Sequence, residues 1–133
     1  MSLIQLVYAS QLRGDESVLS AIHSHAVRNN TAHTITGMLL YANRRFLQVL
    51  EGERDVVHAT FSHIKADPRH EQVTLILEQP IEAHFFQHWN MGFRQLSDEA
   101  LAQHPAYASY FNDDFTHFKT QPQMALEILK NLA

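Results

Sequence analysis

The stretch "RRFLQVLEGERD", residues 44–55, predicts a β-strand that leads into a helix. Apolar side chains from Phe46 to Leu50 are typical of a largely buried strand, yet Gln48 places a primary amide in the middle of the run. A buried amide that lacks hydrogen-bond partners costs roughly 1–3 kcal/mol. We therefore expect Gln48 to meet polar groups inside the same core.

This strand is the second half of a predicted hairpin. "TITGMLLYA" (34–42) and "RRFLQVLEG" (44–52) are both strand-like and are joined near Asn43. The periodicity of the other segments predicts strands at residues 3–10, 72–80 and 89–96, and helices at residues 16–28, where Asp15 is the expected N-cap, and 53–67. The order βαββαβ plus one strand predicts an α+β, ferredoxin-like sheet with a fifth strand and two helices on one face.

The residues after 96 have a helical pattern. A short helix is expected at residues 98–103, and Thr120 and Gln123 match a capping box around Pro122. The apolar stripe of the helix that follows is formed by Met124, Ala125, Ile128, Leu129 and Leu132. We expect residues 97–133 to be a helical extension that packs on the sheet or serves as a contact surface for other proteins.

Composition excludes several classes of protein. The chain has 133 residues, which suits one domain, and its net charge of −4 argues against a generic nucleic-acid binder. The absence of cysteine excludes disulfides and thiolate chemistry. No segment resembles a signal peptide or a transmembrane helix. We therefore expect a cytoplasmic domain with no membrane partner and no direct nucleic-acid partner.

Strand alternation decides which face carries the unusual amide. Gln48 shares a face with Phe46 and Leu50, whereas Glu51 lies on the opposite face. A carboxylate at residue 51 indicates that its own face is partly solvated near the end of the strand. The face of Gln48 is therefore the better candidate for the helix-covered core.

Three polar residues are candidate neighbours of Gln48. Tyr8 lies in the first strand, and Asn29 and Asn30 follow the apolar stripe of the first predicted helix. Each residue has an ordinary explanation, since tyrosine is common in cores and asparagine is common at helix ends. Together, a phenol and several amides between two helices and a sheet would suit a planar heterocycle that has its own donors and acceptors.

Longer motifs carry a resemblance to a known family. "RNNTAHTITGMLLYANRRFLQVLEGERDVV" (28–57), "DPRH" (67–70) and "FFQHWNMGF" (85–93) strongly resemble the BLUF domain, the flavin-binding family of blue-light sensors. The resemblance covers about residues 2–96. It implies a flavin-binding domain at residues 1–96 and FAD as the cofactor, with FMN left open.

The resemblance also assigns residues to the flavin. Tyr8 matches the tyrosine that supplies an electron and a proton to the excited flavin, and Gln48 matches the glutamine between that tyrosine and the ring. Asn30 matches the asparagine at the polar edge of the ring, and Asn29 stands beside it. Further residues that the resemblance places near the flavin are Ile22, Leu39 and Phe46 at the ring, Met91 beside Gln48, and Arg69 and His70 at the ribityl-phosphate end.

The mechanism that the resemblance implies is a hydrogen-bond switch. After electron and proton transfer from Tyr8, the amide of Gln48 rearranges, by rotation or by tautomerisation, and bonds more strongly to the flavin C4 carbonyl. Glutamine suits this task because one rotatable group carries donors and an acceptor. Trp89 and Met91, which match the W-x-M motif of the fifth strand, would pass the change to a protein partner.

Rival functions stay open at this point. We expect a short, non-enzymatic sensor that contacts another protein or changes its own oligomeric assembly, because little chain follows residue 96. A small phosphatase on this fold would need a base and nucleophile pair that the motifs lack. A small flavin-dependent oxidoreductase is the main alternative, since a bound flavin can be reduced.

Ten histidines raise the possibility of a metal site. His23 and His25 point to different sides of a helix, whereas His84 and His88 would share a face only in a helical segment, with Glu82 as the one nearby carboxylate. Scattered surface histidines explain this pattern better, so no metal is expected.

Overall fold

The computed structural model describes residues 2–86, 91–105, 108, 111 and 122–132. Its centre is a five-stranded sheet with the strand order β4-β1-β3-β2-β5. Neighbouring strands are antiparallel except β2 and β5, which are parallel. The strands are β1 (Leu3–Leu12), β2 (Thr36–Ala42), β3 (Arg45–Glu53), β4 (His70–Ile81) and β5 (Gly92–Gln95).

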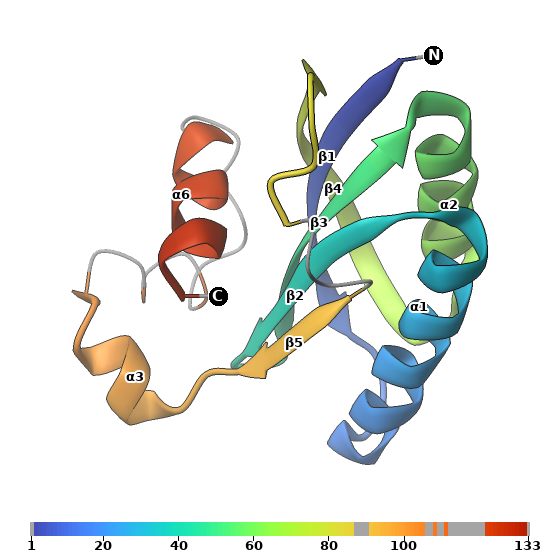
Figure 1. The fold of residues 1–133 in the computed structure, drawn as a ribbon. Coiled ribbons are helices and arrows are strands. Elements are labelled where there is room, and N and C mark those ends of the chain that lie inside the picture. The colour runs from blue at the N-terminus through green and yellow to red at the C-terminus, as the bar shows by residue number, and fades with distance from the viewer. Residues whose placement is uncertain (1, 87–90, 106–107, 109–110, 112–121, 133) are drawn as a thin grey trace.

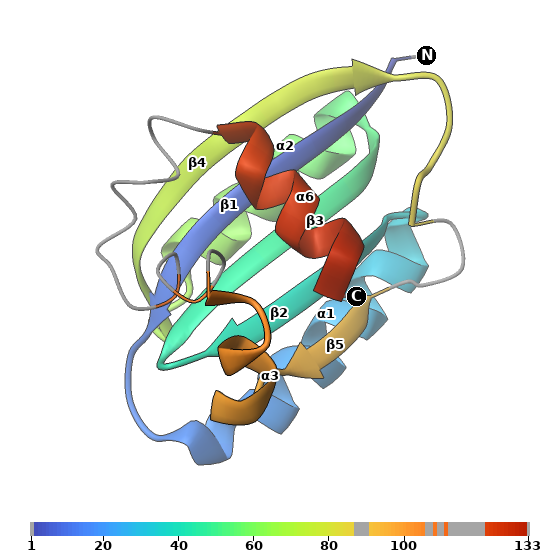
Figure 2. The ribbon, with the colours of Figure 1, turned by 90° about the vertical axis from the view of Figure 1, so that its left-hand side faces the viewer.

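Helices cover both faces of this sheet (Figure 1). On one face lie α1 (Leu19–His33), which follows the 3-10 turn η1 (Glu16–Val18), and α2 (Arg54–Ala66). On the other face α6 (Pro122–Leu132) runs across the strands (Figure 2), and the short α3 (Asp98–Ala102) follows β5. The predicted α+β, ferredoxin-like fold with a fifth strand is confirmed.

The hairpin between β2 and β3 sets the register of the site. Asn43 and Arg44 both have positive φ angles, 50° and 64°, as a two-residue type I′ turn requires. This turn pairs Gln48 with Leu39 on β2, and the pairing of β1 with β3 places Tyr8 directly opposite Gln48 on the other side. Tyr8 and Leu39 are therefore the immediate cross-strand neighbours of the amide.

The first helix begins where the sequence predicts and ends later than predicted. Asp15 caps η1, since its side chain accepts a hydrogen bond of 2.8 Å from the amide of Ser17. The expected end at residue 28 was wrong, because α1 continues through Asn29 and Asn30 to His33. The helix ends at Thr34, which has a left-handed backbone conformation (φ 57°). The backbone N–H of Thr34 donates a hydrogen bond to the carbonyl oxygen of Asn30, and this bond closes the last turn.

The face opposite α1 and α2 is also buried. Apolar residues of α6 pack with those of the sheet; the helix contributes Ala125, Leu126, Ile128 and Leu129, and the strands contribute Val7, Ala9, Met38, Leu40, Leu47 and Val49. Leu126 was not part of the predicted stripe. The side chain of Leu132 and the whole of Thr120 lie outside the described residues.

The expectation of a partly solvated Glu51 was wrong. Its exposed fraction is 0%, because this face of the sheet packs against α6 and the backbone of Phe86 lies against the carboxyl group. The carboxylate accepts one hydrogen bond of 2.7 Å from Gln5 Nε2 and one of 2.8 Å from the backbone amide of Phe86. Glu51 therefore ties β3 to β1 and to the connection that leads toward β5.

Replacing Glu51 with leucine is expected to lower the free energy of unfolding by about 1–3 kcal/mol, because the buried donors on Gln5 and Phe86 lose their acceptor. Urea unfolding followed by circular dichroism measures the change. Glu51→Gln keeps one acceptor oxygen and is expected to show a smaller loss. Equal stability of Glu51→Leu and the wild type would contradict this role.

Candidate functional site

A cavity of about 400 Å3 opens between α1, α2 and the sheet. This volume lies in the range of roughly 300–1,000 Å3 that is usual for small-molecule sites. Apolar side chains mix with amides, a hydroxyl and charged groups. The lining residues are Tyr8, Ile22, His25, Ala26, Asn29, Asn30, Leu39, Gln48, Leu50, Thr60, His63, Ile64, Ala66, Asp67, Arg69 and His70.

Hydrogen bonds satisfy the amide of Gln48 on two sides. The hydroxyl of Tyr8 donates to Gln48 Oε1, and Gln48 Nε2 donates to the sulfur of Met91 at 3.2 Å. All three residues are buried, and Gln48 is only 3% exposed. The predicted need of this amide for polar partners in the core is confirmed, and the chain Tyr8–Gln48–Met91 links the cavity to the residue just before β5.

A glycine makes room for Met91 beside the sheet. A Cβ atom on Gly37 would lie 3.3 Å from Met91 Cε and 2.0 Å from the carbonyl oxygen of Val49. Any larger residue at position 37 would push against β3 and against the methionine. Met91 does not line the cavity itself, so it contacts Gln48 on the side of the amide that faces away from the cavity.

The phenol of Tyr8 is held in its neutral form. Burial raises the pKa of Tyr8 above its ordinary value, and the negative charge of Asp67 raises it further. The ring packs against Phe61 of α2 at a centroid distance of 5.3 Å. Tyr8 is therefore a protonated donor to Gln48 throughout the physiological pH range.

Amides from α1 form the opposite polar wall. Asn29 Nδ2 donates to Asn30 Oδ1 at 3.3 Å and to the hydroxyl of Thr60, on α2, at 3.2 Å. Asn30 is almost fully buried. Because α1 does not stop at residue 28, both asparagines sit on its inner side and reach the cavity.

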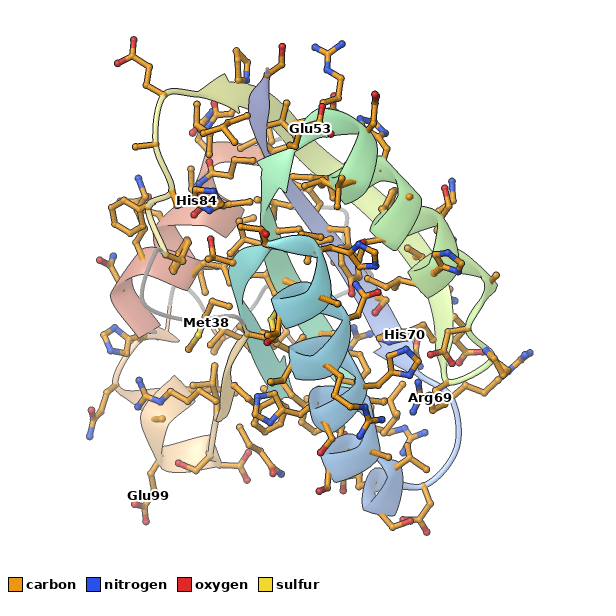
Figure 3. The ribbon with its side chains drawn as sticks, turned by 45° about the vertical axis from the view of Figure 1, so that its right-hand side comes forward. Met38, Glu53, Arg69, His70, His84 and Glu99 are labelled. Atoms are coloured by element: carbon orange, nitrogen blue, oxygen red, sulfur yellow. The ribbon has the colours of Figure 1, made fainter. Side chains whose placement is uncertain are left out.

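An ion pair lies at the end of the cavity where α2 leads into β4. The guanidinium of Arg69 bonds both carboxylate oxygens of Asp67, with Nη2 to Oδ2 at 2.6 Å and Nε to Oδ1 at 3.0 Å. The hydrogen bond from Arg69 lowers the pKa of Asp67, and the same bond raises the pKa of Arg69. Figure 3 shows Arg69 and His70 next to α1.

His70 is a buried, neutral histidine. Burial lowers its pKa to about 4, while Asp67 partly opposes that shift. Its Nδ1 lies 2.9 Å from the hydroxyl of Ser10, and its ring stands 4.9 Å from the ring of Phe46. Phe46 does not itself line the cavity, so its contact with the site runs through His70.

The structure brings most of the predicted site residues to one cavity. Tyr8, Ile22, Asn29, Asn30, Leu39, Gln48, Arg69 and His70 line it, whereas Phe46 and Met91 lie behind the lining. Trp89 lies outside the described residues.

Half of the residues that line the cavity were not predicted from the sequence. The sequence did contain a signal for three of them. Ala26 and Ile64 belong to the apolar stripes of the two helices, and Asp67 is part of the motif "DPRH". No sequence signal indicated Thr60 and His63, since only the packing of α2 beside α1 brings them to the cavity. The other residues missed are His25, Leu50 and Ala66.

Among the residues that the structure describes, no group of three histidine, aspartate or glutamate side chains could hold a metal ion. His84 Nδ1 instead lies within hydrogen-bond distance of the hydroxyl of Thr36, in a segment that is not helical. His88 falls outside the described part. None of the described helices is long and apolar enough to cross a membrane.

Comparison with known proteins decides the family. The family model of BLUF, described as sensors of blue light using FAD, matches residues 3–92. The chain belongs to the BLUF family. The resemblance seen in its motifs is thereby confirmed.

Other BLUF proteins match most of this chain. The photoactivated adenylate cyclase subunit beta of Euglena gracilis is 36% identical in an alignment of 107 residues, and this alignment covers 78% of this chain and only 12% of that protein. The dark-state structure of the BLUF protein BlrB is 28% identical with a TM-score of 0.75, and the match covers 98% of this chain and 97% of BlrB. BlsA in its photo-activated state is 28% identical with a TM-score of 0.74, over 96% of this chain and 94% of BlsA.

BLUF domains bind flavin, and the cavity fits such a ligand. Ile22, Leu39 and Ile64 offer apolar surface to a flat ring. Asn30 and Gln48 present amides, which can both donate to and accept from the polar edge of that ring.

The buried histidine predicts a pH dependence of stability. Folded His70 stays neutral down to pH about 4, whereas the unfolded chain binds the proton near pH 6.5. Between these values the unfolded state holds more protons, so the free energy of unfolding falls with falling pH, by up to about 1.4 kcal/mol per pH unit from this group. The variant His70→Gln is expected to lose this part of the dependence of the unfolding free energy on pH, measured by urea unfolding at several pH values between 7 and 4.5. The surface variant His58→Gln should keep the pH dependence of the wild type. An unchanged pH dependence in His70→Gln would contradict the assignment of this effect to His70.

Proposed function

We propose that this chain is a blue-light photoreceptor that binds flavin between α1 and α2 and uses Tyr8, Gln48 and Met91 as its switch. One observation carries the proposal: the Gln48 amide at the cavity is hydrogen-bonded both to a buried neutral phenol and to the residue that precedes β5. A flavin held there would lie beside the donor and the switch at once.

The chemistry starts at the phenol. A bound flavin would supply the absorption of blue light and an acceptor for one electron and one proton. Tyr8 is the donor in this proposal, because its O–H is directed at Gln48 Oε1. Oxidation makes a phenol strongly acidic, so its proton leaves toward that oxygen. Electron loss from Tyr8 and proton movement through Gln48 are therefore coupled by one hydrogen bond.

The amide of Gln48 then has two hydrogen-bonded arrangements. Loss of the bond from Tyr8 removes what holds Oε1 in place, and either rotation or tautomerisation exchanges the donor and acceptor positions of the amide. Both changes weaken the present bond from Nε2 to the sulfur of Met91. Met91 is released toward a new packing position, and β5 receives the signal because Gly92 follows directly.

FAD is the flavin in this proposal. The description of the family supports it. The partly exposed guanidinium of Arg69 at the cavity can meet a phosphate group, which FAD and FMN both carry. The mass of the chromophore that heating releases from the purified protein tests this choice, and FMN alone would overturn it.

The chain acts as a sensor and not as an enzyme in this proposal. Residues 1–96 form the sensing domain, and residues 97–133 carry the contact surface for a partner protein or a second copy of the chain. The apolar side of α6 packs on the sheet, which leaves Glu127 and Lys130 exposed, with Lys130 Nζ 4.6 Å above the exposed ring of Phe85. Light-independent oxidation of NAD(P)H at useful rates would favour the oxidoreductase alternative instead.

The contact surface can be tested without removing α6, whose deletion would uncover the core. Glu127→Lys combined with Lys130→Glu reverses both exposed charges and leaves the buried side unchanged. The double variant is expected to keep the photocycle and to lose a light-dependent change in mass, measured by light scattering on a sizing column. An identical change in the variant and the wild type would contradict a role of this surface in self-association.

Two substitutions test the switch itself. Gln48→Leu is expected to keep the flavin and to lose the light-induced red shift, because leucine has no hydrogen bond to exchange. Tyr8→Phe is expected to block the normal photocycle, because phenylalanine has no phenol to oxidise or proton to give. Absorption spectra before and after blue light measure both effects.

Tyr41→Phe is the matched control for the phenol. Tyr41 is as buried as Tyr8 and lies on β2, two strands away, but its hydroxyl donates to Glu16 and it does not line the cavity. This variant should retain the red shift. A full reversible shift in Gln48→Leu, or a colourless wild type that takes up no added flavin, would refute the proposed function.

A further inference from the structure

His23 on α1 contacts the backbone of Met91. Its Nε2 lies 2.9 Å from the carbonyl oxygen of Met91. A carbonyl oxygen can only accept, so Nε2 carries the hydrogen and donates it. The imidazole also packs against Phe93 of β5 in a tilted arrangement, at a centroid distance of 5.1 Å and an interplanar angle of 34°.

Met91 is therefore held at two of its atoms by two different elements. His23 binds its carbonyl oxygen, and Gln48 of β3 binds its sulfur at 3.2 Å. The space left by Gly37 admits the side chain and little more, since a Cβ there would already be 3.3 Å from Met91 Cε. A fixed backbone at residue 91 thus determines whether the sulfur reaches the amide.

The same turn of α1 also faces the cavity. Ile22, the residue before His23, is part of the cavity lining. One turn of this helix thus contacts the proposed flavin site on one side and the start of β5 on the other. The sequence alone does not indicate this double contact, because it suggested only that His23 was a surface histidine.

We propose that His23 is a positioning residue of the photoswitch. By holding the carbonyl of Met91 it presents the sulfur to Gln48, and so it sets the rate at which the illuminated protein returns to its dark state. This inference rests on the proposed function. A histidine that merely stabilised the fold would not act through Met91, and that difference can be measured.

The first test compares two substitutions of similar size. Gln can replace the donor, because its Nε2 is separated from Cα by the same number of bonds as that of histidine, whereas Leu cannot donate. Both His23→Leu and His23→Gln are expected to bind flavin and to show the red shift. The dark-recovery rate should change roughly threefold to tenfold in His23→Leu, as for the loss of one hydrogen bond, and less than about twofold in His23→Gln. A His23→Gln variant that recovers like His23→Leu would overturn the inference.

The second test asks whether the effect passes through Met91. In a Met91→Leu background the sulfur is gone, so adding His23→Leu should change the recovery rate by less than about twofold. Equal fold-changes in both backgrounds would overturn the inference, since they would show that His23 acts independently of the methionine.

A third measurement does not depend on the photocycle. Labelling methionine methyl groups with carbon-13 gives few signals, and Met91→Leu identifies the one from Met91. His23→Leu should shift that signal in the dark and leave those of Met38 and Met124 in place, and His23→Gln should restore it. A wild type without a red shift would refute the proposed function alone. An unmoved Met91 signal in His23→Leu would refute the role of His23.

Discussion

A buried carboxamide cannot be left without hydrogen-bond partners, and Gln48 imposes this requirement on the centre of the molecule. Its oxygen needs a donor, which Tyr8 supplies from the neighbouring strand, and its nitrogen needs an acceptor, which the sulfur of Met91 supplies. A thioether is a weak acceptor. The amide therefore accepts from a hydroxyl on one side and donates to a weak acceptor on the other. In the proposed function this suits a group that is stable in the dark and still able to rearrange.

The two faces of β3 are linked to the same part of the chain. Gln48 reaches Met91 on the face covered by α1 and α2, and Glu51 reaches the amide of Phe86 on the face covered by α6. Phe86 lies within the link between β4 and β5, and Met91 is the last residue of that link. A single strand thus contacts the link at two points, through the amide of Gln48 and through the side chain of Glu51. A change at Gln48 acts on the one of these points that lies next to β5.

Local patterns were enough for most of the fold. Alternation and helical periodicity identified the five strands, both helices on the sheet and the helical tail, because these patterns depend only on side chains a few residues apart. They failed at the end of α1, where the bonds around Thr34 outweigh the preference of asparagine for helix ends. They failed again at Glu51, because alternation tells which face a residue shares and says nothing of what covers that face.

The sequence by itself determined that Tyr8 and Gln48 would share a face of one sheet, and its motifs identified the family. Only the tertiary structure decided that they would be direct cross-strand neighbours, that Thr60, His63 and Asp67 would join the cavity, and that His23 would reach the carbonyl of Met91. The physical reason is the distance along the chain between the residues that interact. The face of a side chain follows from its own strand or helix, whereas the contact between His23 and Met91 depends on how residues that are 68 positions apart in the chain pack together.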